Sequence, residues 1–268
     1  MDKNNQSTNM SFTRMFCALL LLCSVSNVFA LTPENGWWWN PQESGRGFNL
    51  EVQNGTVFLA TFIYNDAGNA VWYSGSGVLQ ADNTVTINLS EFANGQCVQC
   101  TYQAPALVGA IETATLRFTS SGTAELNWSN GIVALQRFNF SLGGTWQEQL
   151  IGEWSVVAGN SSFPAYTGDR ITFTGLEQSD TLDVVGHRTG NANAKISVFS
   201  AAANTINGYT LSAFMSTNTS TIRAYAFNLS GLNKIEGITV DVSSTATAEE
   251  ITQALSTQGV PFIGFRVK

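Results

Sequence analysis

Charged side chains are scarce in this sequence. Only 12% of its 268 residues are Asp, Glu, Lys or Arg, whereas about a quarter is usual for a globular protein. The 12 basic residues are outnumbered by 19 acidic ones, which gives a net charge of −7. Because binding to nucleic acid or to anionic lipid requires a basic surface, we expect neither class of function.

Histidine is almost absent too, and the familiar catalytic motifs are missing. A single histidine rules out a metal centre built from several histidines. The sequence has no P-loop, dinucleotide-binding fingerprint, EF-hand, HExxH or G-x-S-x-G motif, so we expect no cofactor and no chemistry that depends on one of these motifs. The hydrophobic content of 44% is nevertheless too high for a disordered chain, so a packed core is expected.

The first thirty residues have the pattern of a secretory signal peptide. Arg14 precedes an apolar run from Met15 to Cys23 that is too short to span a bilayer, and Ala30 ends a typical cleavage site. Cleavage after Ala30 would leave 10 basic and 18 acidic residues in a secreted or periplasmic chain. A lipoprotein acylated at Cys23 is the alternative, although Leu22 is bulkier than the residue usually found before such a cysteine.

No later segment approaches eighteen uninterrupted apolar residues, so no integral membrane segment is expected after cleavage. A membrane β-barrel would need a continuous apolar girdle, which strands rich in glycine and asparagine do not supply.

Residues 31–144 alternate between short strands and tight turns. Turn sequences such as Asn54-Gly55 and Asn130-Gly131 tolerate the positive φ angles of hairpins. The pattern predicts an antiparallel, eight-stranded barrel or sandwich. Its expected strands are Gly47–Gln53, Thr56–Tyr64, Ala70–Val78, Thr84–Leu89, Thr101–Ala104, Ala110–Phe118, Thr123–Trp128 and Ile132–Phe140.

Residues 145–268 predict a second β-rich domain that carries one late helix. Thr247 and Glu250 form a capping-box pattern, and Gly259 follows a short amphipathic stretch, so we expect a helix over about 248–258. Both halves begin with Gly-x-Trp and end with adjacent Arg and Phe. This similarity suggests that the two halves are a diverged duplication, and the match is weak. The strands expected in this half are Glu153–Val157, Arg170–Thr174, Thr181–Val185, Lys195–Phe199, Tyr209–Phe214, Thr221–Phe227, Gly237–Val242 and Phe262–Val267.

The most distinctive stretch is Gly36-Trp-Trp-Trp-Asn-Pro-Gln-Glu-Ser-Gly-Arg-Gly-Phe48, followed by a Tyr-x-x-x-Gly-x-x-x-Trp-Tyr hairpin from Tyr64 to Tyr73. Residues 36–140 resemble a family of secreted proteobacterial proteins that share these motifs. The resemblance implies secretion and brings no established activity with it.

Aromatic side chains are the leading candidates for a binding site. In an extended chain, alternation places Trp37 and Trp39 on one face and Trp38 on the other. Rings presented in a cleft stack on sugars or enclose apolar ligands, whereas the structural alternative is that they plug a barrel end or fill its core. The candidate ligand-binding residues are Trp37, Trp38, Trp39, Arg46, Trp72, Tyr73 and Trp128.

Charged residues near the tryptophans offer an enzymatic alternative. Arg46 is expected to pair with Glu43 or Glu51, which would orient the local structure. A glycoside hydrolase would instead use Glu43 and Glu51 as its two carboxyl groups, provided that both face one cleft.

Cys97 and Cys100 form a C-x-x-C pattern flanked by turn residues and strands. A redox-active pair of this spacing begins a helix in a βαβ unit, and a zinc site would need a second pair of ligands. We therefore expect a local disulfide between Cys97 and Cys100.

Together these patterns predict a secreted or periplasmic, non-catalytic binding protein with an aromatic site. Its partner would be a small apolar or carbohydrate ligand or an envelope protein. The alternatives are a structural or protein-interaction module of the cell envelope and the glycoside hydrolase.

Overall fold

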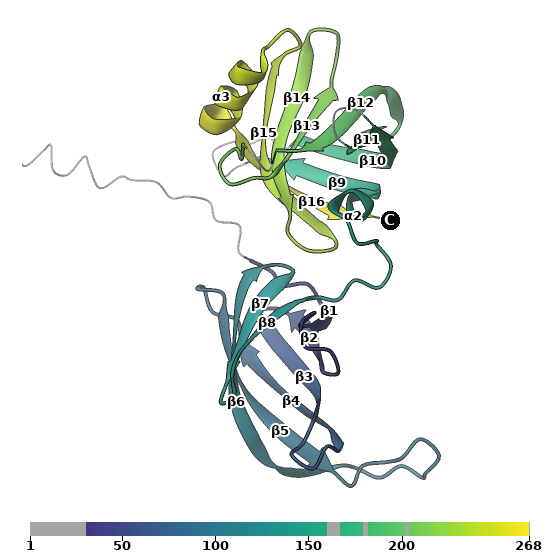
Figure 1. The fold of residues 1–268 in the computed structure, drawn as a ribbon, viewed down its shortest axis with the longest axis vertical. Coiled ribbons are helices and arrows are strands. Elements are labelled where there is room, and N and C mark those ends of the chain that lie inside the picture. Colours follow the sequence, from purple (N-terminus) through teal and green to yellow (C-terminus); the bar gives the residue numbers. More distant parts are fainter. Residues whose placement is uncertain (1–30, 160–166, 179–181, 202–203, 268) are drawn as a thin grey trace, which may run out of the picture.

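The computed structural model describes residues 31–159, 167–178, 182–201 and 204–267. Within these ranges the chain forms two closed, eight-stranded antiparallel barrels that follow one another in sequence (Figure 1). The all-β prediction is confirmed, and the first half is a barrel. The predicted signal peptide, residues 1–30, lies outside the described residues. No helix in the described ranges is long and apolar enough to cross a membrane.

In the first barrel each strand pairs with the next, and β1 returns to pair with β8. The expected strand Thr101–Ala104 is wrong, because the pairing of β5 with β6 ends at Ala93 and Ala106. The strand that replaces it in the barrel is β1 (Gly36–Trp39), which was not predicted because three consecutive tryptophans hide the alternation of polar and apolar residues. The strands are β1 (Gly36–Trp39), β2 (Gly47–Gln53), β3 (Thr56–Tyr64), β4 (Ala70–Val78), β5 (Thr84–Ala93), β6 (Ala106–Ser120), β7 (Thr123–Trp128) and β8 (Gly131–Arg137).

The second barrel repeats this meander, and β9 pairs with both β10 and β16. All eight strands expected in this half correspond to an observed strand. They are β9 (Gly152–Ala158), β10 (Thr167–Gln178), β11 (Leu182–Arg188), β12 (Asn191–Ser200), β13 (Leu211–Ser216), β14 (Thr221–Leu229), β15 (Lys234–Ser243) and β16 (Val260–Arg266).

Two helices accompany the second barrel, and both begin with a capping box. The expected helix is α3 (Ala248–Gln258), in which Thr247 and Glu250 cap each other. Ile251 and Leu255 pack it against the outside of β14 and β15. The five-residue α2 (Trp146–Leu150) was not expected from the sequence, although Thr145 and Glu148 have the same spacing.

Apolar side chains fill the interior of both barrels. An eight-stranded barrel is just wide enough for its inward-facing side chains, which alternate along each strand with outward-facing ones. The core of the first barrel consists of Trp38, Phe48, Leu50, Val57, Leu59, Val85, Ile87, Leu89, Ala114, Leu116, Phe118, Ala124, Leu126, Val133 and Leu135.

A tryptophan and an arginine meet where the first barrel closes. Trp38 on β1 lies opposite Arg137 on β8, and the Trp38 indole Nε1 donates to the carbonyl of Glu34 at 3.1 Å. Arg137 Nη1 donates to the carbonyl of Trp37 at 2.6 Å. These hydrogen bonds hold the segment that precedes β1 against the pair of strands, β1 and β8, that closes the barrel.

The second barrel closes in the same way. Trp154 lies opposite Arg266, whose guanidinium carbon is 4.5 Å from the centre of the indole. Trp154 Nε1 donates to the carbonyl of Leu150 at 2.8 Å, and Arg266 Nη1 donates to that of Ile151 at 2.6 Å. The shared Gly-x-Trp and Arg of the two halves therefore serve one structural purpose.

The barrels meet through two hairpin turns. The buried hydroxyl oxygens of Ser121, after β6, and Ser230, after β14, are 3.0 Å apart. The Glu34 carboxylate accepts the backbone N–H groups of Leu232 and Asn233 at 3.1 and 2.7 Å. Because turns alternate between the two ends of a meander, this contact leaves the opposite end of the first barrel, hereafter the distal end, away from the second (Figure 1).

Candidate functional site

The distal end of the first barrel contains a hollow of about 660 Å³. This volume lies within the range of small-molecule sites, which is about 300–1,000 Å³. The β1–β2 loop, the β3–β4 turn, the β7–β8 turn and the start of β6 converge here because all four are at the same end of the meander. The lining residues are Ser44, Gly45, Arg46, Ile63, Tyr64, Asp66, Tyr73, Leu89, Ile111, Glu112, Trp128, Ser129 and Asn130.

Three aromatic side chains line this distal hollow. Trp128 and Tyr73 are half-buried and pack against the barrel core, where the Trp128 ring centre is 6.0 Å from that of Phe48. Tyr64 is 60% exposed at the end of β3. The hollow thus offers two anchored rings and one accessible ring.

Arg46 covers part of the Trp128 ring. Its guanidinium carbon is 5.7 Å from the ring centre, a distance at which a cation is attracted to the π face. Glu43 forms an ion pair with it from the same loop. Burial lowers the pKa of Arg46, and its buried Nε has no hydrogen-bond partner among the described residues.

Acidic and hydroxyl groups supply the rest of the polar lining. Both the hydroxyl and the backbone N–H of Ser129 donate to Glu112, the N–H at 3.2 Å. The hydroxyl bond is the main reason why the pKa of Glu112 is lowered. Burial, reinforced by the carboxylates of Glu91 and Asp66, raises the pKa of Tyr73, so its phenol remains a neutral hydrogen-bond donor at neutral pH.

The structure brings Arg46, Tyr73 and Trp128 together in the hollow, out of the seven candidate ligand-binding residues. Trp38 is instead fully buried in the barrel core, so it has the structural role that was the alternative to ligand binding. The remaining three rings lie on the outside of the barrel.

Each outer tryptophan packs against a phenylalanine ring. Trp37 contacts Phe62 with ring centres 5.2 Å apart, and Trp72 stacks on Phe92 at 5.8 Å. The Trp37 ring lies over Gly47, where a Cβ would come within 2.2 Å of it. Trp39 packs against Phe138 at 4.8 Å. These rings cover the barrel wall and do not line the distal hollow.

Glu43 and Glu51 do not face one cleft. Glu43 lies in the β1–β2 loop at the distal end with Arg46. Glu51 lies on β2, four residues beyond Gly47, which corresponds to about 13 Å along a strand. It accepts a hydrogen bond from Asn35 at 3.1 Å, toward the other end of the barrel. The pair therefore does not present the carboxyl arrangement that a glycoside hydrolase needs.

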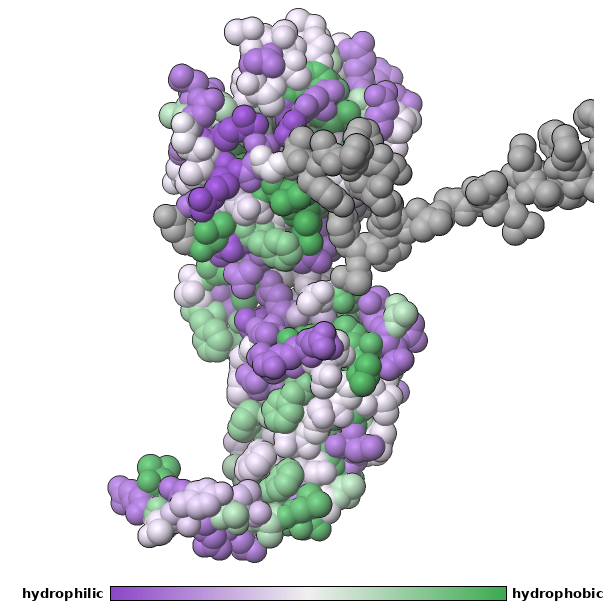
Figure 2. Space-filling view, turned by 180° about the vertical axis from the view of Figure 1, so that it is seen from behind, coloured by the Kyte–Doolittle hydropathy of each residue, from purple (hydrophilic) through white to green (hydrophobic). Residues whose placement is uncertain are grey.

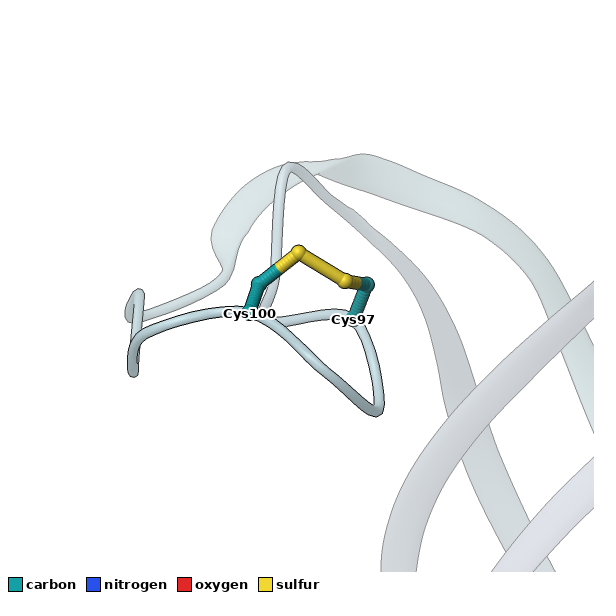
Figure 3. The surroundings of a disulfide bond; sticks show 2 residues. All are labelled: Cys97 and Cys100. Carbon is teal, nitrogen blue, oxygen red and sulfur yellow. A yellow bond between two sulfur atoms is a disulfide. The ribbon is translucent and has the colours of Figure 1, made fainter.

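Cys97 and Cys100 form the expected disulfide, in the loop that joins β5 to β6 (Figure 3). Both residues are exposed, and neither lines the distal hollow. The bond closes a small ring within the loop.

Sequence reasoning missed Tyr64, Asp66, Ile111, Glu112, Ser129 and Asn130. Their signal was topological: in an up-and-down meander every second turn lies at the same end, so the turns after β1, β3 and β7 share a rim. Combining the Asn65–Gly68 and Ser129–Gly131 turns with the Glu43–Arg46 loop would have indicated this rim.

A second hollow of about 750 Å³ lies where the barrels meet. Trp146, Tyr209 and Glu236 line it from the second barrel, and Thr119 and Ser120 from the first. Burial, together with Glu236, raises the pKa of Tyr209. This hollow contains none of the candidate ligand-binding residues.

In the described part of the chain, no group of three or more His, Cys, Asp or Glu side chains could hold a metal ion. No protein-family model matches the chain, and a search of curated proteins finds no match.

Proposed function

We propose that the chain is a secreted or periplasmic, non-catalytic binding protein whose site is the distal hollow of the first barrel. The observation that carries this proposal is the convergence of Trp128, Tyr73 and Arg46 in an open hollow of small-molecule size. These residues come from three separate parts of the sequence. Their proximity is therefore not a consequence of lying in the same hairpin.

A carbohydrate fits this lining better than a purely apolar ligand. Rings stack on the apolar faces of a sugar, while hydroxyl groups need hydrogen-bond partners around the rim. Arg46 and the neutral phenol of Tyr73 supply donors, and Asp66 and Asn130 supply acceptors. An apolar ligand would form no hydrogen bonds with these groups.

A protein-interaction module of the cell envelope is the second candidate. The observation that favours it is the number of large apolar side chains on the outside of the first barrel, among them Phe58, Phe62 and Trp72, each more than 40% exposed. Exposed apolar patches of this kind mark interaction surfaces.

Tryptophan fluorescence tests the binding proposal. We expect a saturable change in emission when the chain from Leu31 onward is titrated with the correct member of a panel of neutral oligosaccharides. Tyr64→Ala should weaken binding about tenfold, because loss of the ring contact with the sugar removes on the order of 1.4 kcal/mol of binding free energy. Tyr64 is mostly exposed, so this variant should fold normally.

Trp72→Ala is the matched control, since it removes a ring of the outer wall and leaves the hollow intact. Binding should persist in this variant. An unresponsive spectrum across the panel, or equal weakening by Tyr64→Ala and Trp72→Ala, would contradict a site in the distal hollow.

A further inference from the structure

Twenty consecutive residues, 92–111, carry no charge in a chain whose net charge is −7. They form the end of β5, the disulfide loop and the start of β6, and we call them the arm. Glu91 and Glu112 bound the arm on either side. Figure 1 shows that the arm extends past the distal end of the barrel, away from the second barrel.

The arm leaves one strand edge open. Residues 106–112 of β6 pair with β5, but β6 pairs with β7 only from Thr115, opposite Asn127. Among the described residues, no strand therefore pairs with residues 106–113 on the side away from β5. Such an edge presents unpaired backbone N–H and C=O groups and is a template for another strand.

Both ends of this edge are closed. Pro105 has no N–H to donate, and the Glu112 carboxylate accepts the N–H of Thr113 at 3.0 Å. The open part is thus residues 106–111, which contain neither the lysine nor the proline that proteins use to block edges. The β5–β6 pairing is irregular at Val108 and Ile111, and bulges of this kind increase the local twist of the arm.

The side chains beside the edge are apolar and accessible. Leu107 is 63% exposed and Val108 is 58% exposed, and Tyr102 is exposed in the disulfide loop. In Figure 2 the arm, at the lower left of the view, carries hydrophobic residues among hydrophilic ones. The edge therefore offers apolar contacts in addition to backbone hydrogen bonds.

We propose that residues 106–111 pair antiparallel with the same residues of a second copy of this chain. Two β5–β6 ribbons would then form one four-stranded sheet around a twofold axis. A contact around a twofold axis brings the same surface of both copies together, so that surface must be self-complementary. The edge strand meets this requirement because it is uncharged, and no like charges face each other across the axis. Since the arm projects from the barrel, the acidic bodies of the two copies stay apart, and salt screens charges beyond about 8 Å. This inference does not rest on the proposed function, although Ile111 at the end of the edge also lines the distal hollow.

Analytical ultracentrifugation of the chain from Leu31 onward tests the proposal. We expect a concentration-dependent monomer–dimer equilibrium. The double variant Leu107→Lys with Val108→Lys should raise the dimer Kd about a hundredfold, because it brings like charges together across the twofold axis. Both side chains are exposed in the monomer, so the variant should fold normally.

Val78→Lys with Ile132→Lys is the matched control. These side chains are 62% and 69% exposed, they lie on β4 and β8, and the charge change is the same. The control should leave the Kd within about twofold of the parent chain, and backbone amides of residues 106–111 should gain hydrogen-exchange protection with concentration. A monomer at every concentration would overturn self-pairing and favour an extended segment of another protein. A dimer that Leu107→Lys with Val108→Lys does not weaken would also overturn it.

Discussion

The three consecutive tryptophans show how one residue type takes different roles. Alternation along β1 places Trp38 inside the barrel, where it anchors the closing seam, and places Trp37 and Trp39 outside. The sequence predicts this division correctly. What it does not reveal is that Trp37 and Trp39 pack on Phe62 and Phe138, because these partners are distant in the sequence and come close only in the folded barrel.

At the residue scale, Ser129→Ala should return the pKa of Glu112 toward its ordinary value of 4.5. In the folded chain the Ser129 hydroxyl stabilises the ionised carboxylate, so the pKa is lowered. A carboxyl group with a lowered folded pKa adds stability above pH 4.5, which is lost as the pH falls through the folded value. The variant should therefore lose less stability on acidification than the parent.

An NMR titration of the Glu112 side-chain carboxyl carbon measures this shift. Asp82 is the internal control, because Thr84 lowers its pKa independently of Ser129. An unchanged pKa for Glu112 in the variant, with Asp82 also unchanged, would contradict the assigned hydrogen bond.

At the scale of elements, hairpins with asparagine–glycine turns were predicted best. The bounds of β2 and β3 agree with the prediction, because Asn54 and Gly55 adopt the positive φ angles that such turns require. The bounds of β4 and β7 agree as well, and the turns beside them contain Gly68 and Gly131, which also have positive φ. The extent of β5 and β6 was missed, since irregular pairing breaks the alternation there. The short α2 was missed because five residues give almost no helical periodicity.

Strands β4 and β5 approach so closely that only glycine fits at two inward positions. A Cβ on Gly75 would lie 2.3 Å from the backbone oxygen of Asn88, and one on Gly77 would lie 2.2 Å from that of Thr86. We expect Gly75→Ala to lower the free energy of unfolding by about 1–3 kcal/mol, because the backbone must shift to make room. Chemical denaturation measures the change.

Gly175→Ala is the comparison, since a Cβ there meets nothing within 4 Å. This variant should leave the free energy of unfolding unchanged or raise it slightly, because alanine lowers the conformational entropy of the unfolded chain. Equal stability of the two variants would show that β4 and β5 do not need this close approach.

At the scale of the whole molecule, the candidate site depends on topology more than on motif. The chemistry of Arg46, Tyr73 and Trp128 makes them candidates in the sequence. Their meeting follows from the barrel, which places the turns after β1, β3 and β7 at one end. The sequence indicates hairpins, and which turns share a rim follows only once the number and order of the strands are known. The contact between the barrels through Glu34 and Ser121 was likewise invisible, because its partners are about a hundred residues or more away in the sequence.

Backbone and indole NMR shifts during oligosaccharide titration test the central claim most directly. The account predicts saturable changes at Arg46, Asp66, Asn130 and the Trp128 indole N–H. Amides of the second barrel and the Trp154 indole N–H should not respond, because they lie beyond the other end of the first barrel. Shifts confined to the second barrel or to the outer rings of Trp37 and Trp72 would contradict a binding site in the distal hollow.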